Sequence, residues 1–369
     1  MTRWREPAPG EQEAGDRSWD VVRRAYEERL PAPRARDRRP LIALAVGAAI
    51  VAAAFSPPGL AFWGSIRHAV SSEDHLLALP TRGRVLVNAQ GGAWVVNHDG
   101  SKRFLSGYAD AAWSPHGLYL AAAHENELVA LEPNGKVHWK LARKGLVGGA
   151  QWSYEGYRIA YLTGHALRVV NGDGTGDRLI TPNAVGSGLP ALAWRPGTHE
   201  LLYTNGRGQL VLLDVDRSRI LWRRPSLGTE DIAWSGDGRR LLVADARPRI
   251  LDAGGRLVAE FGSSSVLPAA FIPRSHAIAL VKVAKGHSSV IVYSGPRYRR
   301  HRAVFSGAGL FGGVAWSPDG RWLLVDWRAA DQWLFIRSAA VRRIAVRNIG
   351  NTFDSGPEHY ATLGGWCCP

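Results

Sequence analysis

A short motif recurs along the chain about every 40 residues, and this repeat constrains the fold more than any other feature. Two copies are nearly the same: AWSPHGLYLAA at 112–122 and AWSPDGRWLLV at 315–325. A repeat of this period is typical of β-propellers and solenoids, in which each unit buries its faces against its neighbours. Six copies align, and they are centred on Trp113, Trp152, Trp194, Trp234, Phe271 and Trp316.

A second sequence signal recurs with the same period as the motif. About 21 residues after the aromatic residue, four of the repeats carry a dipeptide suited to a tight hairpin: Asn134-Gly135, Asp173-Gly174, Asp216-Arg217 and Gly254-Gly255. The segments between these landmarks, such as RRLLVADA and SVIVYSG, are short and apolar and lack a helical period. Each repeat therefore predicts four short strands, which form one propeller blade.

The two ends of the repeat region each hold part of a further blade. Residues 84–107 contain three strand-like runs with no motif before them, and the ending ATLGGWCC contains a lone motif-like Trp366. Joining these parts in one sheet closes the ring and removes two exposed edges. We therefore predict an all-β fold, a seven-bladed β-propeller over 82–369 closed by pairing of its N- and C-terminal strands. A six-bladed ring is the alternative.

The recurring aromatic residue is interpreted as a wedge between adjacent blades, because a four-stranded sheet cannot cover both of its faces alone. The predicted wedge residues are Trp113, Trp152, Trp194, Trp234, Phe271, Trp316 and Trp366.

The segment 41–63 contains no charged residue and is long enough to span a bilayer as a helix. Arginines are concentrated before it, which predicts a cytoplasmic N-terminus and a propeller outside the membrane. We expect a basic cytoplasmic leader with a short amphipathic helix over 1–40, a transmembrane helix over 41–63 and a linker over 64–81. The alternative is a cleaved export signal and a secreted propeller. The arginines before the segment are Arg23, Arg24, Arg29, Arg34, Arg36, Arg38 and Arg39.

The formal net charge of +14 allows anionic partners, but compositional bias and a solvated basic surface are the favoured interpretation. The densest basic cluster outside the leader is RYRRHR at 297–302, in the longest repeat. Several arginines on one loop can bind phosphate or carboxylate groups. The candidate anion-binding residues are Arg297, Arg299, Arg300 and Arg302, and no nucleic acid partner is expected outside the membrane.

Only two cysteines occur, Cys367 and Cys368, which excludes a disulfide scaffold and a cysteine zinc cage. Adjacent residues of an extended strand point to opposite faces, so we expect no bond between these two. One thiol is then buried and the other is free to form a disulfide-linked dimer. A disulfide between the neighbours at the chain end is the alternative.

The sequence predicts no catalytic residue, metal site or cofactor. It contains no nucleophile-elbow, zinc-protease, P-loop or dinucleotide motif, and its histidines lack metal-ligand spacing. GDGTGD at 172–177 has two aspartates suited to calcium, but it falls where each repeat has its hairpin turn, and we interpret it as a turn.

At W-S-P-D-G followed by an apolar strand, the chain resembles the bacterial WD-repeat-like, or TolB-like, propellers. The resemblance implies a binding or assembly module. With the predicted anchor, we expect a cell-envelope protein that presents its propeller to a protein, peptide or anionic envelope polymer.

An alternative resemblance is to the tryptophan-docking repeats of quinoprotein dehydrogenases, in LVALEPNGKVHW at 128–139 and LVLLDVDRSRILW at 210–222. This would imply an enzyme with a quinone cofactor. However, no paired calcium carboxylates can be assigned, and the adjacent cysteines end the chain.

Overall fold

The computed structural model describes residues 78–184, 191–226, 229, 231–245, 247–262, 268–338, 343–353 and 360–368. The predicted leader, the predicted membrane span and most of the predicted linker lie outside these ranges. None of the helices in the described part has the length and apolar character needed to cross a membrane.

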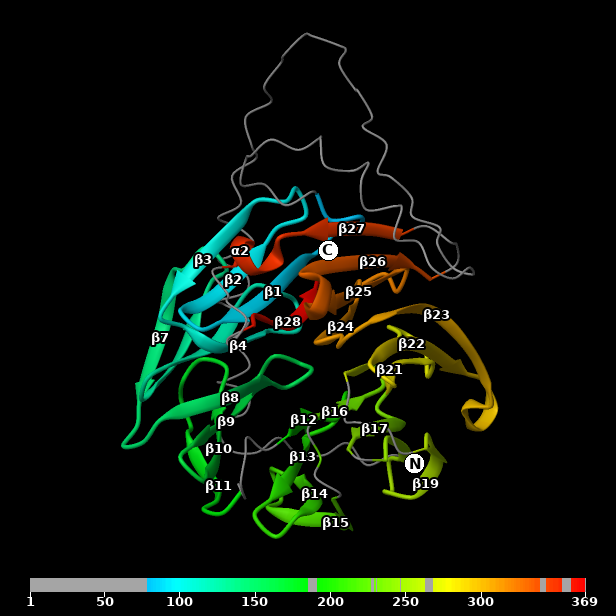
Figure 1. The fold of residues 1–369 in the computed structure, drawn as a ribbon. Coiled ribbons are helices and arrows are strands. Elements are labelled where there is room, and N and C mark those ends of the chain that lie inside the picture. The colour runs from blue at the N-terminus through cyan, green and yellow to red at the C-terminus, as the bar shows by residue number, and fades with distance from the viewer. Residues whose placement is uncertain are drawn as a thin grey trace, which may run out of the picture. The chain divides into compact units, whose positions relative to one another are not determined.

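Seven antiparallel four-stranded sheets follow one another around a ring (Figure 1). This arrangement confirms the all-β class and the seven-bladed propeller, and the six-bladed alternative is wrong. The first strands of successive blades contact one another around a central channel, and each blade extends outward from there. We number the blades in chain order from the blade that contains β1.

The first four blades are built as follows. Blade 1 comprises β28 (Thr362–Cys367), β1 (Arg84–Ala89), β2 (Gly92–Val96) and β3 (Lys102–Ser106). Blade 2 comprises β4 (Ala109–Trp113), β5 (Leu120–His124), β6 (Glu127–Leu131) and β7 (Val137–Ala142). Blade 3 comprises β8 (Val147–Trp152), β9 (Arg158–Thr163), β10 (Ala166–Asn171) and β11 (Arg178–Thr181). Blade 4 comprises β12 (Leu192–Trp194), β13 (Glu200–Asn205), β14 (Gln209–Asp214) and β15 (Arg219–Pro225).

The last three blades repeat this order. Blade 5 comprises β16 (Asp231–Trp234), β17 (Arg240–Ala244), β18 (Arg249–Asp252) and β19 (Leu257–Glu260). Blade 6 comprises β20 (Ala269–Phe271), β21 (Ile278–Ala284), β22 (His287–Ser294) and β23 (Arg300–Ala308). Blade 7 comprises β24 (Gly313–Trp316), β25 (Trp322–Trp327), β26 (Gln332–Arg337) and β27 (Arg343–Arg347). The described helices are single turns: η1 (Pro296–Tyr298), η2 (Arg328–Ala330) and α2 (Ile349–Thr352).

The ring is closed by hydrogen bonding between the two ends of the propeller. β28 pairs antiparallel with β1, with Val85 opposite Trp366 and Arg84 opposite Cys367. The predicted pairing of N- and C-terminal strands is confirmed, and it places the last motif residue in the innermost strand of blade 1.

The core is divided among the spaces between neighbouring blades. Trp316 of blade 7 clusters with Ala279 and Val281 of blade 6. Trp366 of blade 1 clusters with blade 7, where its ring centroid lies 5.6 Å from that of Phe335. In each case the motif residue packs against the preceding blade, which explains why one residue type recurs once per repeat.

The remaining wedge residues take equivalent places. Trp113, Trp152, Trp194, Trp234 and Phe271 all join a cluster that includes residues of the preceding blade. Trp194, Trp234, Trp316 and Trp366 are buried, whereas Trp113, Trp152 and Phe271 are partly buried.

The expectation for the cysteines is wrong. Cys367 and Cys368 form a disulfide with each other, so neither offers a thiol for a linked dimer. The expectation treated both residues as extended strand, but β28 ends at Cys367 and Cys368 has a φ of +49°. The turn at Cys368 removes the alternation of faces on which the expectation depended.

Deleting residues 362–368 should make the propeller associate and lose stability. The deletion removes β28, which exposes the hydrogen-bonding edge of β1 and uncovers the packing face of blade 7. Light scattering coupled to gel filtration and thermal unfolding measure both effects, with Thr362→Ala, an exposed position of the same strand, as the control. A shortened chain that remains monomeric with an unchanged melting temperature contradicts the closure argument.

Candidate binding site at the centre of the ring

The motif itself builds the turns that surround one mouth of the central channel. In blade 7, the Ser317 hydroxyl accepts a hydrogen bond from the backbone N–H of Trp322 (2.9 Å) and donates one to Asp319 Oδ1 (2.6 Å). Asp319 Oδ1 also accepts from the backbone N–H of Arg321 (3.0 Å). Gly320 follows with a φ of +68°, a conformation that glycine adopts without strain. The turn is therefore fixed by side-chain hydrogen bonds within the motif.

The same turns are joined to their neighbours around the channel. In blade 5, Ser235 donates to Asp237 Oδ1, and Asp237 Oδ2 lies 2.8 Å from His276 Nε2 of blade 6. In blade 7, Asp319 Oδ2 accepts a hydrogen bond from the Thr81 hydroxyl (2.9 Å). One carboxylate oxygen thus orders its own turn and the other oxygen holds the adjacent segment.

A cavity of about 1730 Å³ occupies the centre of the ring. Residues of all seven blades line it, from the inner strands and from the motif turns. This volume exceeds the range of roughly 300–1,000 Å³ that is typical of small-molecule sites. Its lining includes His116, Tyr154, Asp231, Asp237, Arg274 and Asp319.

The mouth of this cavity combines charges of both signs with an exposed aromatic ring. Hydrogen bonds from Ser235, the backbone of Arg239 and His276 outweigh partial burial and lower the pKa of Asp237 to about 2. Arg274, in the motif turn of blade 6, supplies positive charge beside it. Tyr154 also lines the cavity and remains 54% exposed, which is unusual for a large aromatic side chain.

Asp231, at the start of β16, also lines the cavity, and its side chain is exposed there with the inner strands around it. Burial raises the pKa of Asp231 to about 6, although the carboxylate accepts a hydrogen bond from the backbone N–H of Ile232 (2.8 Å). This carboxyl therefore takes up a proton at a pH well above that of an ordinary aspartate.

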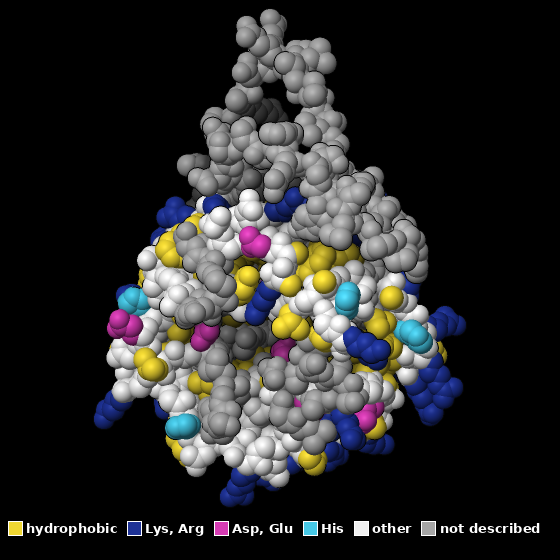
Figure 2. Space-filling model, in the orientation of Figure 1, with side chains coloured by type: hydrophobic (Ala, Val, Ile, Leu, Met, Phe, Trp, Pro, Cys, Tyr) yellow, Lys and Arg dark blue, Asp and Glu magenta, His cyan; other side chains and the backbone are white. Residues whose placement is uncertain are grey.

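The predicted basic cluster is placed elsewhere. Its four arginines lie on η1, directly after η1 and at the start of β23, in the outer hairpin of blade 6, and all are exposed. Arg302 donates a hydrogen bond to the carbonyl of Ser338 in blade 7 (2.8 Å), and Tyr298 is buried against Phe261. Figure 2 shows Lys and Arg side chains projecting from much of the outer edge, including the side where β23 lies in Figure 1. Arg297, Arg299, Arg300 and Arg302 are not brought together with the cavity residues.

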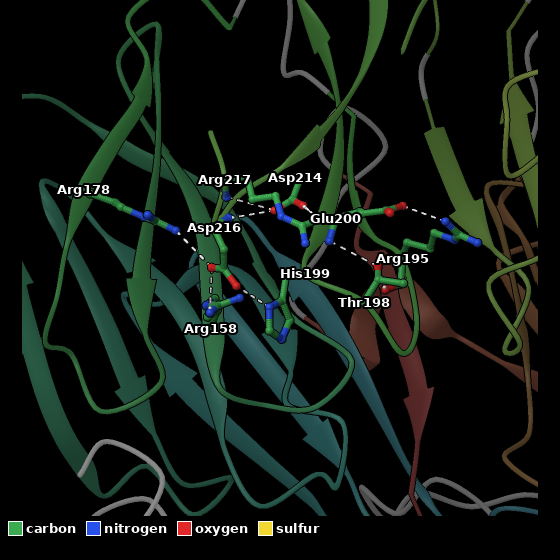
Figure 3. A network of polar contacts seen from close by, with 9 residues as sticks. All are labelled: Arg158, Arg178, Arg195, Thr198, His199, Glu200, Asp214, Asp216 and Arg217. Carbon is green, nitrogen blue, oxygen red and sulfur yellow. Dashed lines mark hydrogen bonds and ion pairs between the residues drawn. The ribbon is translucent and has the colours of Figure 1, made fainter. Parts of the chain in front are cut away.

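A polar network links blades 3 and 4 away from the channel (Figure 3). Asp216 Oδ1 accepts from Arg158 of blade 3 (2.8 Å), Arg178 of β11 approaches the same oxygen at 3.5 Å, and His199 contacts the other oxygen. Burial opposes ionisation of Asp216, but Arg158 and His199 outweigh it and lower its pKa. Arg195 extends the network through Glu200 and through the carbonyl of Gly238 in blade 5. These contacts hold adjacent blades together.

Within the described part of the chain, no cluster of three or more His, Cys, Asp or Glu residues could hold a metal ion. The segment 172–177 forms a hairpin turn in which Thr175 N–H donates to Asp173 (2.9 Å). Asp177 is paired with Arg143 (2.6 Å) and Arg168, so its carboxylate is already neutralised.

Sequence reasoning missed Tyr154 and Asp231. A signal for Tyr154 was available, because it stands in W-S-Y-E-G where the Trp113 and Trp316 copies have proline. Asp231 carries no local signal, since its environment is made by strands of other blades.

Comparison with solved structures identifies the fold. The chain is similar to a chain of "Crystal Structure of Mitotic Checkpoint Complex", with 16% identity, a TM-score of 0.57, and coverage of 78% of this chain and 100% of that one. It is also similar to "KlHsv2 with loop 6CD replaced by a Gly-Ser linker", at 13% identity and a TM-score of 0.52 over 72% of this chain and 94% of that one. A third similar structure is "Kuenenia stuttgartiensis Hydrazine Synthase", at 16% identity and a TM-score of 0.51 over 67% and 79%. No protein family profile and no curated protein sequence matches the chain. The similarities therefore show a WD40-like propeller fold.

Replacing Asp231 with asparagine should stabilise the protein at pH 7.5, by about 1 kcal/mol once the water-facing part of the carboxyl is taken into account. The folded-state pKa near 6 is above the ordinary value of 3.8, so ionisation is disfavoured in the fold and the penalty disappears as the pH falls below about 4. Denaturant unfolding from pH 2 to pH 8 measures this difference.

Asp237→Asn is the contrasting control. Its folded-state pKa near 2 means that the carboxylate stabilises the fold above pH 4, and that this stabilisation is lost toward pH 2. Equal and pH-independent effects of the two substitutions would contradict the assigned environments.

Proposed function

We propose that this protein is a binding scaffold of the TolB-like type, which holds a protein or peptide partner at the mouth of its central cavity. The observation that carries the proposal is the cavity of about 1730 Å³, to which all seven blades contribute residues. A site assembled from seven separate turns presents many independent contact points on a rigid frame, as required for recognition of a polypeptide surface.

The chemistry of the mouth favours a polypeptide over a uniformly charged ligand. Asp237 and Asp319 supply negative charge, while Arg82 and Arg274 supply positive charge. Exposed aromatic residues surrounded by charged groups are common anchors of protein interfaces. Tyr154 meets this description.

An anionic envelope polymer is the second candidate ligand, and it would use the exposed arginine hairpin of blade 6 instead. The motif turns connect the first strand of a blade to the second, and this hairpin connects the third strand of blade 6 to the fourth. In an antiparallel sheet both connections lie at the same end of the strands, so the motif turns and this hairpin belong to the same side of the ring. A large partner could therefore contact both.

We further propose that the propeller is displayed outside the cytoplasmic membrane by a single helix over 41–63. The support is the charge-free length of this segment and the arginines that precede it.

Tyr154→Ala should weaken partner binding by about 2 kcal/mol, the size of effect expected for an aromatic anchor. The matched control is Tyr157→Ala, because Tyr157 is equally exposed at 55% in the same turn but does not line the cavity. A photo-crosslinking amino acid at position 154 in intact cells should capture the partner, and the purified pair then allows the affinities to be measured. Equal effects of the two substitutions, or capture from position 157 alone, argue against this site.

Protease added to spheroplasts should degrade the propeller and leave an epitope placed before residue 41 intact. The expected result follows from the proposed orientation, in which only the leader is in the cytoplasm. Immunoblotting for both parts, with and without detergent, provides the measurement. Protection of the propeller until detergent is added contradicts the orientation.

A further inference from the structure

A second cavity, of about 940 Å³, lies between blades 3 and 4. It is lined by β11 of blade 3 and by β13, β14 and β15 of blade 4, with their adjoining turns. Its volume is within the range of sites for small organic molecules. The described residues that line it include three arginines, Arg178, Arg207 and Arg223, and neither Asp nor Glu.

One end of this groove contains a buried phenol beside a guanidinium. Tyr203 lies opposite Val211, and Val211 lies opposite Arg223, so the three side chains occupy one row on the same face of blade 4. Tyr203 is only 6% exposed, yet it lines the groove, and its hydroxyl has no hydrogen-bond partner among the described residues. Burial raises the pKa of Tyr203 against the opposing influence of Arg223, so the hydroxyl remains a donor at neutral pH.

A second guanidinium lies toward the same end. Arg207 is in the turn between β13 and β14, two residues after the end of the strand that carries Tyr203. The backbone N–H of Arg207 donates to Asn205 Oδ1 (3.0 Å), but within the described part of the chain neither the Arg207 nor the Arg223 guanidinium forms an ion pair or a hydrogen bond. Two unpaired guanidinium groups and a phenol donor are suited to a carboxylate or a phosphate, which accept several charge-assisted hydrogen bonds.

Apolar side chains form one part of the remaining lining, and polar side chains form the other: Thr181, Asn183, Asn205, Gln209 and Ser218. Val211 and Leu213 of β14 are buried along its length, and Ile180 and Ile220 flank them from β11 and β15. At the far end, Arg178 points toward Asp216, as Figure 3 shows, and its charge is partly balanced there. The unbalanced positive charge is therefore concentrated at the end that contains Tyr203.

We propose that this groove binds an amphipathic organic anion, a carboxylate or phosphate ester on an aliphatic chain. The head group is held by Tyr203, Arg207 and Arg223, and the hydrocarbon chain lies along Val211, Leu213, Ile180 and Ile220. The site is separate from the central cavity, so this proposal does not depend on the proposed partner binding.

Calorimetric titration of the full-length chain with short probes tests the proposal. Hexanoate and hexyl phosphate are the anionic probes, hexanol removes the charge, and inorganic phosphate removes the chain. At least one anionic probe should bind about tenfold or more tighter than both hexanol and inorganic phosphate, and the tighter anion identifies the head group. Failure of both anions to bind, or equal binding of hexanol, overturns the proposal.

Substitutions locate the binding. Tyr203→Phe, Arg207→Ala and Arg223→Ala should each weaken the anion by about tenfold, and Arg207→Ala changes only an exposed turn residue and so leaves folding intact. Arg219→Ala is the matched control, because Arg219 is exposed on the same strand as Arg223 but does not line the groove. Unchanged binding in the Tyr203 and Arg207 variants, or an equal loss in the Arg219 variant, overturns the assignment.

Discussion

The contact between the aromatic residue of each inner strand and the sheet of the preceding blade is the interaction on which the ring depends. A buried aromatic side chain removes about 150–250 Å² from water, which stabilises the fold by about 4–6 kcal/mol at 25 cal/mol per Å². Because each blade needs a neighbour on both sides, an open ring would leave two apolar faces exposed. The pairing of β28 with β1 meets this requirement, and it brings Trp366 against Phe335 of blade 7.

The buried aromatic wedge also determines where the motif turns lie and which side chains they present to the cavity. Once the Trp is buried, the following Ser-Pro-Asp-Gly segment is fixed at the channel mouth by its own hydrogen bonds, as at Ser317 and Asp319. Positions that depart from the motif then present different side chains on equivalent backbone frames. Tyr154, His116 and Arg274 are such departures, and each lines the cavity. The recurring residues thus build the frame, and the exceptions give the mouth its chemical character.

The spaces between blades are not equivalent at their outer ends. Between blades 3 and 4 the network around Asp216 joins β9 and β11 to the turns of blade 4, and an open groove lies beside it. β11 has four residues whereas β15 has seven, so the outer strands of these two blades differ in the surface they cover. The central cavity and this groove are lined by different residues, so the two proposed sites are independent of each other.

The sequence by itself determined the repeat, the four strands of each blade, the blade count and the closure of the ring. These properties are local or periodic: hairpin dipeptides such as Asn134-Gly135 specify turns, and packing between identical units requires the same residue once per unit. Only the tertiary structure decided that Tyr203 and Arg223 line one groove bordered by another blade, and that Asp231 lines the central cavity. It also decided that Cys367 bonds to Cys368, since the pairing depends on where β28 ends. Burial and proximity of this kind are set by strands distant in the sequence, and no local pattern of residues encodes them.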